Sequence, residues 1–145
     1  MFTVGVFQDV EWADRGLAAL LADGFPPQVL TILAKSTPEA AALIAARLGS
    51  PGRDLDVEKL GRVVGTGSML AALEGHDNRM ASAGLAGAIG RAGFQAHDGY
   101  IFEKLVERGG VLVAVESEPR AADALAKLHA YGGGNAAIGA WSGRV

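Results

Sequence analysis

Two of the three histidines in this sequence are followed directly by aspartate, as His76-Asp77 and His97-Asp98. An imidazole next to a carboxylate could bind a divalent metal ion or perform acid–base catalysis, with His97 as the general base. Adjacent residues of a helix do not share a face, however, and neither pair has the ligand spacing of a zinc motif. In the alternative interpretation Asp98 caps the helix that follows it, and His76-Asp77 lies in a solvated turn. We keep these four residues as candidates for a ligand or metal site and assign no catalytic residue.

A glycine-rich segment, Gly65-Thr66-Gly67-Ser68, follows two valines and could belong to a dinucleotide-binding loop. The third glycine of that fingerprint, which is needed where helix and strand touch, is replaced by Leu70. The sequence also contains no GxxxxGKS/T loop for phosphate. Close packing between helices accounts for these glycines more simply, so we predict no cofactor.

The composition is that of one globular domain. The chain has 145 residues, half of them hydrophobic, which is enough to bury a substantial core. Its formal net charge of −3 argues against a nucleic-acid partner, because binding a phosphate backbone needs clustered lysine and arginine. The chain has no cysteine, and its first residues resemble a strand rather than a signal peptide. We therefore expect a cytoplasmic location.

The elements that would position these residues are organised around the strand that begins at Val111. Paired glycines at 109 and 110 end the preceding helix, because glycine enters the left-handed region without a Cβ clash. The valine-rich run that follows is apolar on both faces, which predicts a central strand. Pro119 then suits the first position of the next helix, where a missing N–H has no consequence.

An earlier copy of this strand–turn–helix–glycine unit lies at the start of the chain. Five identities relate the copies at a constant offset: Val4, Val6, Ala13, Asp14 and Gly24 match Val113, Val115, Ala122, Asp123 and Gly133. Two βαβ halves in one domain indicate an α+β fold, the ferredoxin-like split βαβ sandwich. The halves would be residues 1–34 and 98–145, joined by an insertion at 35–97, within a single domain of residues 1–145.

Local signals place the other elements. Asp9 suits the N-cap of the first helix, and Thr37 starts the second helix before a proline. Residues 53–59 are ambiguous between a short strand and the start of a helix. The expected strands, besides the central one, are 3–7, 28–34 and 135–141, and the expected helices follow Asp9 and Asp98 and span 38–48 and 119–131.

The middle of the chain, residues 60–93, is rich in glycine, with one at every third position from Gly84 to Gly93. In a solvated helix each glycine costs about 1 kcal/mol relative to alanine, so close packing of helices must offset this loss. We therefore predict a helical, glycine-rich insertion. Its apolar runs, 63–73 and 80–90, are too short to cross a membrane, which needs about 20 residues.

Several motifs carry a family resemblance. They are Val4-Gly5-Val6-Phe7, Ala22-Asp23-Gly24-Phe25, Ala92-Gly93-Phe94, Tyr100 to Glu103 and Glu107 to Val115. These segments resemble the bacterial general stress protein family (heat-induced stress protein, YflT-like). In that family a strand–helix–strand half is joined through a glycine-rich middle to a helix, two glycines and a valine-rich strand. The charged run from Glu74 to Arg79 and the helix at 38–48 depart from the pattern. The resemblance implies a role in stress response and supplies no catalytic signature.

The two faces of the predicted sheet lead to the functional prediction. We expect the repeat helices to cover the face formed by Val4, Val6, Val113 and Val115. The opposite face is also apolar and must be covered by the insertion, by a ligand or by another subunit. The candidate assembly surface comprises Phe7, Leu112, Trp12 and Trp141.

From these patterns we expect a non-enzymatic, stress-related interaction domain. It would self-associate through its sheet and helical insertion, as a homodimer or a larger homo-oligomer. One alternative is a sensor module that binds a small molecule or a metal ion between the sheet and the insertion. A further alternative is a small enzyme that uses His97 as general base.

Overall fold

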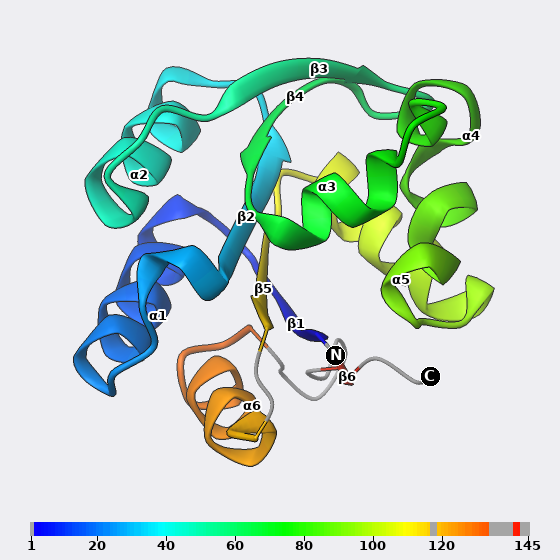
Figure 1. The fold of residues 1–145 in the computed structure, drawn as a ribbon. Coiled ribbons are helices and arrows are strands. Elements are labelled where there is room, and N and C mark those ends of the chain that lie inside the picture. Colours follow the sequence, from blue (N-terminus) through cyan, green and yellow to red (C-terminus); the bar gives the residue numbers. More distant parts are fainter. Residues whose placement is uncertain (1, 117–118, 134–140, 143–145) are drawn as a thin grey trace.

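The computed structural model of this chain describes residues 2–116, 119–133 and 141–142. An antiparallel sheet carries helices on both faces, which confirms the α+β class (Figure 1). The strand order is β3-β4-β2-β5-β1-β6. The strands are β1 (Phe2–Phe7), β2 (Leu30–Lys35), β3 (Arg53–Val57), β4 (Gly61–Thr66), β5 (Val111–Glu116) and β6 (Trp141–Ser142). No helix in these ranges is long and apolar enough to cross a membrane.

β5 is a central strand, as its valine-rich sequence predicts. It pairs antiparallel with β1 on one side and with β2 on the other, so that Val113 lies opposite both Gly5 and Ile32. β1 and β2 therefore run parallel to each other on either side of β5. Helix α1 (Val10–Ala22) connects these two strands.

The first two helices begin where local signals place them. The backbone N–H of Trp12 donates to Asp9 Oδ1 at 2.9 Å, and that of Ala40 donates to Thr37 Oγ1 at 3.1 Å. Each bond satisfies a backbone donor that has no partner within its own helix. Helix α2 (Pro38–Leu48) ends at Gly49, whose φ of +74° is the left-handed conformation expected there.

Two helical layers cover the sheet. Helices α1, α2 and α6 pack on one face, and helices α3, α4 and α5 pack on the other (Figure 1). The bounds of the remaining helices are α3 (Ser68–Glu74), α4 (Arg79–Ala88), α5 (Ala96–Glu107) and α6 (Ala121–Ala130), with short 3-10 helices η1 (Pro27–Val29) and η2 (Ile89–Ala92). The two cores are built around Leu17, Ile44 and Val113 on the first face and around Met69, Phe102 and Leu112 on the second. Helices α3, α4 and α5 therefore cover the face that α1 and α6 leave open.

The expected assignment of β1 residues to the two faces is wrong. Val4 and Val6 lie opposite Ala114 and Leu112 and belong to the core under α3, α4 and α5. Phe7 belongs instead to the core under α1, α2 and α6. The repeat offset equates Val4 with Val113, but the strand register pairs Val113 with Gly5. A shift of one residue moves every side chain of a strand to the other face.

The segment predicted as a helical insertion contains a β-hairpin. β3 and β4 extend the sheet beyond β2, which β4 joins through pairs from Ile32–Thr66 to Lys35–Val63. Gly65 therefore lies in a strand, where an added Cβ would be 2.9 Å from the carbonyl oxygen of Ile32. This glycine permits close packing within the sheet rather than between helices.

Helix α4 is interrupted at Gly84, the first of the regularly spaced glycines. Gly84 has φ +74° and ψ −177°, which no helical residue adopts. Glu103 of α5 accepts a 3.0 Å hydrogen bond from the N–H of Ala86 and thereby caps the helical segment that restarts after the break. The close approach of α4 and α5 occurs instead at Gly99, where an added Cβ would be 3.0 Å from the Cα of Ala86.

Helix α6 is shorter than expected at both ends. Helix α6 begins at Ala121 and ends at Ala130, inside the predicted range of 119–131. Residues 135–140 of the predicted last strand lie outside the described residues. Strand β6 pairs with β1 through Trp141 opposite Val4 and Ser142 opposite Thr3.

Candidate functional site

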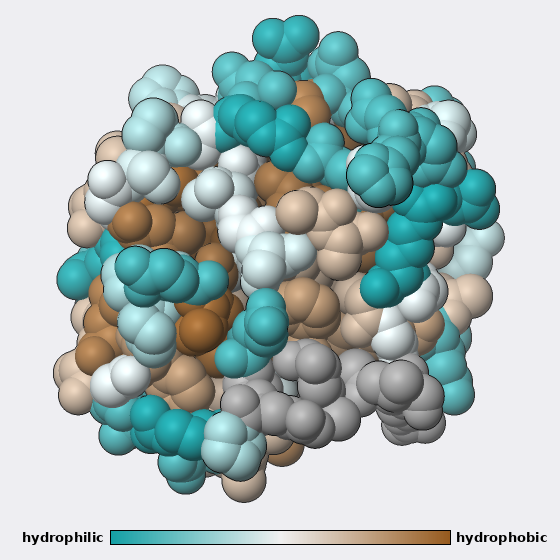
Figure 2. Space-filling model, viewed as in Figure 1, coloured by the Kyte–Doolittle hydropathy of each residue, from teal (hydrophilic) through white to brown (hydrophobic). Residues whose placement is uncertain are grey.

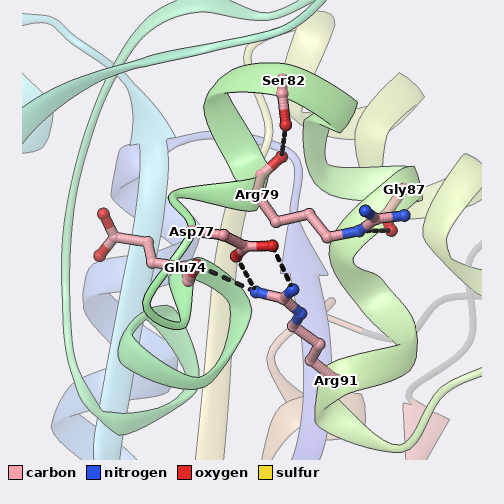
Figure 3. A network of polar contacts seen from close by, with 6 residues as sticks. All are labelled: Glu74, Asp77, Arg79, Ser82, Gly87 and Arg91. Atoms are coloured by element: carbon pink, nitrogen blue, oxygen red, sulfur yellow. Dashed lines mark hydrogen bonds and ion pairs between the residues drawn. The ribbon is translucent and has the colours of Figure 1, made fainter.

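The carboxylate of Asp77 binds an arginine (Figure 3). Arg91 donates from Nη1 to Oδ1 at 2.7 Å and from Nη2 to Oδ2 at 2.8 Å. Nη1 also donates to the Glu74 carbonyl oxygen at the end of α3, at 3.0 Å. The hydrogen bonds from Arg91 hold the pKa of Asp77 below its ordinary value. Both carboxylate oxygens are thus engaged, and His76 is exposed in the turn between α3 and α4.

The second pair, His97 and Asp98, opens helix α5. This helix starts at Ala96, earlier than expected, and its N-cap is Gln95. Asp98 accepts the backbone N–H of Gln95 at 3.4 Å and so completes a capping box from the third helical position, which corrects its predicted role as the N-cap itself. Asp98 is buried, whereas His97 is exposed. In the part of the chain that the structure describes, no group of three or more His, Cys, Asp or Glu could hold a metal ion.

The segment of residues 65–68, which was considered as part of a dinucleotide-binding loop, spans the end of β4, the turn at Gly67 and the start of α3. Gly67 has φ +125° and lies so close to Thr31 that a side chain there would collide with it. The N–H of Met69 donates to Thr31 Oγ1 at 3.0 Å, and Ser68 Oγ donates to Glu116 Oε2 at 2.9 Å. These contacts attach the turn to β2 and β5, so the polar groups of Ser68 and Thr31 have structural partners.

The four candidate assembly residues differ in exposure. Phe7 and Leu112 are 0% and 1% exposed and lie in different cores. Neither can contact a second subunit, because the two helical layers of the chain already cover both faces of the sheet. This result removes Phe7 and Leu112 from the predicted assembly surface. Trp12 is 37% exposed, and the side chain of Trp141 lies outside the described residues.

Trp12 lies in the first turn of α1, beside the C-terminal end of α6. Together with His129 and Ala130 it lines a hollow of about 330 Å³. The guanidinium carbon of Arg15, one turn further along α1, is 4.9 Å from the centroid of the Trp12 ring. This cation–π contact orients the ring without covering it completely.

The outer side of α6 continues this apolar region. A second hollow is lined by Ala122, Leu125, Ala126 and His129, which recur at the spacing of one helical face. The opposite side of α6 is buried through Ala124 and Leu128, so the helix is apolar on both sides. The helical spacing is visible in the sequence, but only the burial pattern distinguishes the outer side from the inner. We call the residues Trp12, Ala122, Leu125, Ala126 and His129 the Trp12–α6 surface.

Comparison of the chain with protein-family models, with curated proteins and with solved structures gave no significant match. The resemblance to the general stress protein family therefore remains a prediction that depends on the glycine and valine motifs alone.

Proposed function

We propose that this chain is a non-enzymatic interaction domain that self-associates through the Trp12–α6 surface. The observation that carries the proposal is the exposure of Trp12 beside a helix that is apolar on its outer side. Tryptophan is enriched among the residues that dominate protein–protein binding energy, because its large ring buries much surface at little entropic loss. The sequence predicted self-association through the sheet; the Trp12–α6 surface takes its place as the proposed contact site.

A second copy of the chain is the partner that this surface fits. Glu11 and Arg15 flank Trp12, while Lys127 and His129 lie on α6, so the region carries both signs of charge. A two-fold rotation can therefore bring opposite charges together across the contact. The net charge of −3 produces only weak repulsion between copies.

The edge strand β3 is a less suitable contact for self-association than the Trp12–α6 surface. Figure 2 shows hydrophilic side chains gathered over β3 and α4, at the top and right of the view, and apolar side chains at the surface on the side of α1 and α2. If β3 paired antiparallel with β3 of a second copy over all five residues, Asp54 of one copy would lie opposite Asp56 of the other. Like charges directly opposite each other destabilise such a pair of strands.

The proposal includes a ferredoxin-like core. The strand order β6-β1-β5-β2, with α1 and α6 on one face, supports this assignment, and the elements from α2 to α5 then form the insertion. A role in stress response rests on the motif resemblance, and a cytoplasmic location rests on the absence of cysteine.

The test compares two aromatic truncations. Trp12→Ala is expected to weaken self-association at least tenfold, while Tyr100→Ala, which removes an exposed aromatic from α5 on the opposite face, leaves it unchanged. Leu125→Glu places a charge in the same contact and should also dissociate the assembly. Light scattering coupled to size-exclusion chromatography gives the mass of each variant over a concentration series. An unchanged mass for both Trp12→Ala and Leu125→Glu would rule out this surface.

A further inference from the structure

A separate hollow of about 280 Å³ lies at the end of the sheet where β2 begins and β4 ends. Pro27, Leu30 and Leu48 supply its apolar wall. Leu30 is held by its pairing with Val115 in the sheet, and Leu48 is the last residue of α2. The wall is therefore part of the rigid framework of the fold, which is the usual setting of a preformed ligand site.

Three neutral polar side chains share this hollow with the apolar wall. They belong to Gln28, Ser50 and Thr66. None of the three side chains has a hydrogen-bond partner among the described residues. One amide and two hydroxyls can both donate and accept hydrogen bonds, so together they can match a ligand with amide or hydroxyl groups.

The charges around the hollow restrict the ligand further. No lysine, arginine, aspartate or glutamate is among the described residues that line it. The C-terminal end of α2, next to Leu48, has a partial negative charge, and the N-terminal end of α3, at Gly67, has a partial positive one, so the two helix ends together favour neither an anion nor a cation. Gly67 lines the hollow with a φ of +125° and has no room for a side chain, so the backbone itself borders the site.

We propose that this hollow binds a small neutral molecule that combines an aliphatic group with an amide or hydroxyl group. Pro27, Leu30 and Leu48 would contact the aliphatic part, and Gln28, Ser50 and Thr66 would hydrogen-bond the polar part. The site is independent of the Trp12–α6 surface, with which it shares no lining residue. Binding here would add a sensing function to an interaction domain.

N-acetylleucinamide is a suitable probe, because it is neutral and joins an isobutyl group to two amides. Titrated into the isotopically labelled chain, it should produce saturable NMR shifts at residues 48–50 and 66–67. The expected Kd is on the order of millimolar, as is typical of a ligand with about a dozen non-hydrogen atoms. The anionic N-acetylleucine should bind at least fivefold more weakly. Equal affinity for both compounds would overturn the assignment of a neutral ligand.

Thr66→Val removes a hydroxyl from the hollow and keeps the side-chain shape, so we expect at least a fivefold increase in Kd. Gln28→Leu, at an exposed position, provides the same test if Thr66→Val affects folding. The matched control is Ser82→Ala, which removes an exposed hydroxyl from α4 and should leave Kd unchanged. Shifts that do not saturate, that spread over the whole chain, or that persist unchanged in the hollow variants would refute the site.

Discussion

Helices α1 and α2, which pack on one face of the sheet, and helices α3 and α4, which pack on the other, are capped by different means. Helices α1 and α2 begin at side-chain caps supplied by the residue directly before them, Asp9 and Thr37. Helices α3 and α4 depend on polar contacts between different elements, whereas α5 has its own capping box from Gln95 and Asp98. Arg91 joins the end of α3 to the turn before α4, and Glu103 of α5 caps the restarted half of α4.

The lengths of the helices explain this difference. α1 has 13 residues and α2 has 11, whereas α3 has 7 and α4 is interrupted at Gly84. Short helices gain little from propagation and leave a larger share of their backbone groups without internal partners. Helices α3 and α4 therefore need long-range caps, whereas α1 and α2 begin at local ones. Both layers cover their face of the sheet, and Trp12 with the outer side of α6 forms an apolar region that the described residues leave exposed.

The sheet that both layers share should be the most sensitive part of the molecule. Val113→Asp places an unpaired charge in a fully buried central strand and is expected to remove about 5 kcal/mol or more, which is comparable with the whole stability of a small domain, so that the chain unfolds. Ala126→Asp, on the outer side of α6, should remain folded. Circular dichroism during thermal unfolding compares the two variants. A native transition in Val113→Asp would contradict the assignment of β5 as the central strand.

Gly84→Ala tests only the layer formed by α3, α4 and α5. The left-handed φ strains any side chain at this position, and an added Cβ would be 2.9 Å from the Glu58 carbonyl oxygen and 3.0 Å from Glu103. We expect a loss of about 2 kcal/mol in the free energy of unfolding. Gly90→Ala is the matched control, because its Cβ would meet no atom within 4 Å, and it should be neutral or stabilising by about 0.5 kcal/mol. Urea denaturation measures both, and equal effects would show that the break at Gly84 is not required.

The smallest effect concerns the Arg91–Asp77 contact. Arg91 lowers the pKa of Asp77 in the folded chain, so the contact stabilises the fold above the unfolded-state pKa of about 3.9 and is lost as pH falls through the lower folded value. Asp77→Asn should therefore lower the urea midpoint slightly at pH 7, and the difference from the unsubstituted chain should disappear in stronger acid. Asp56→Asn, which breaks a longer 3.4 Å contact with Arg62, serves as the comparison. A difference that persists at low pH would assign the effect to packing instead.

The elements that follow from local chemistry were predictable from the sequence. The Asp9 and Thr37 caps, the end of α2 at Gly49 and the central position of β5 all depend on neighbouring residues or on a continuous apolar run. The strand at β3 was one of two alternatives for residues 53–59, because charged residues alternate along it, and β4, which begins with Gly61, was not predicted. The strand character of this hairpin comes from the pairing of β4 with β2 and with β3.

The candidate site was less predictable because it depends on register and on distant partners. A one-residue error in aligning the repeats placed Phe7 on the wrong face. Phe7 and Leu112 are buried because helices cover both faces of the sheet, which the sequence pattern does not show. Asp77 was considered as a ligand because its partner, Arg91, lies on a separate element that sequence spacing does not connect to it. Trp12 was identified, but its neighbours on α6 become visible only when α1 and α6 are packed side by side.

The mass of the unsubstituted chain in solution tests the central claim most directly. Sedimentation equilibrium at increasing protein concentration should show a shift from 14.8 kDa toward twice that mass, because the Trp12–α6 surface pairs two copies of the chain. A mass that stays at 14.8 kDa up to high concentration would contradict self-association and leave the Trp12–α6 surface without its proposed partner.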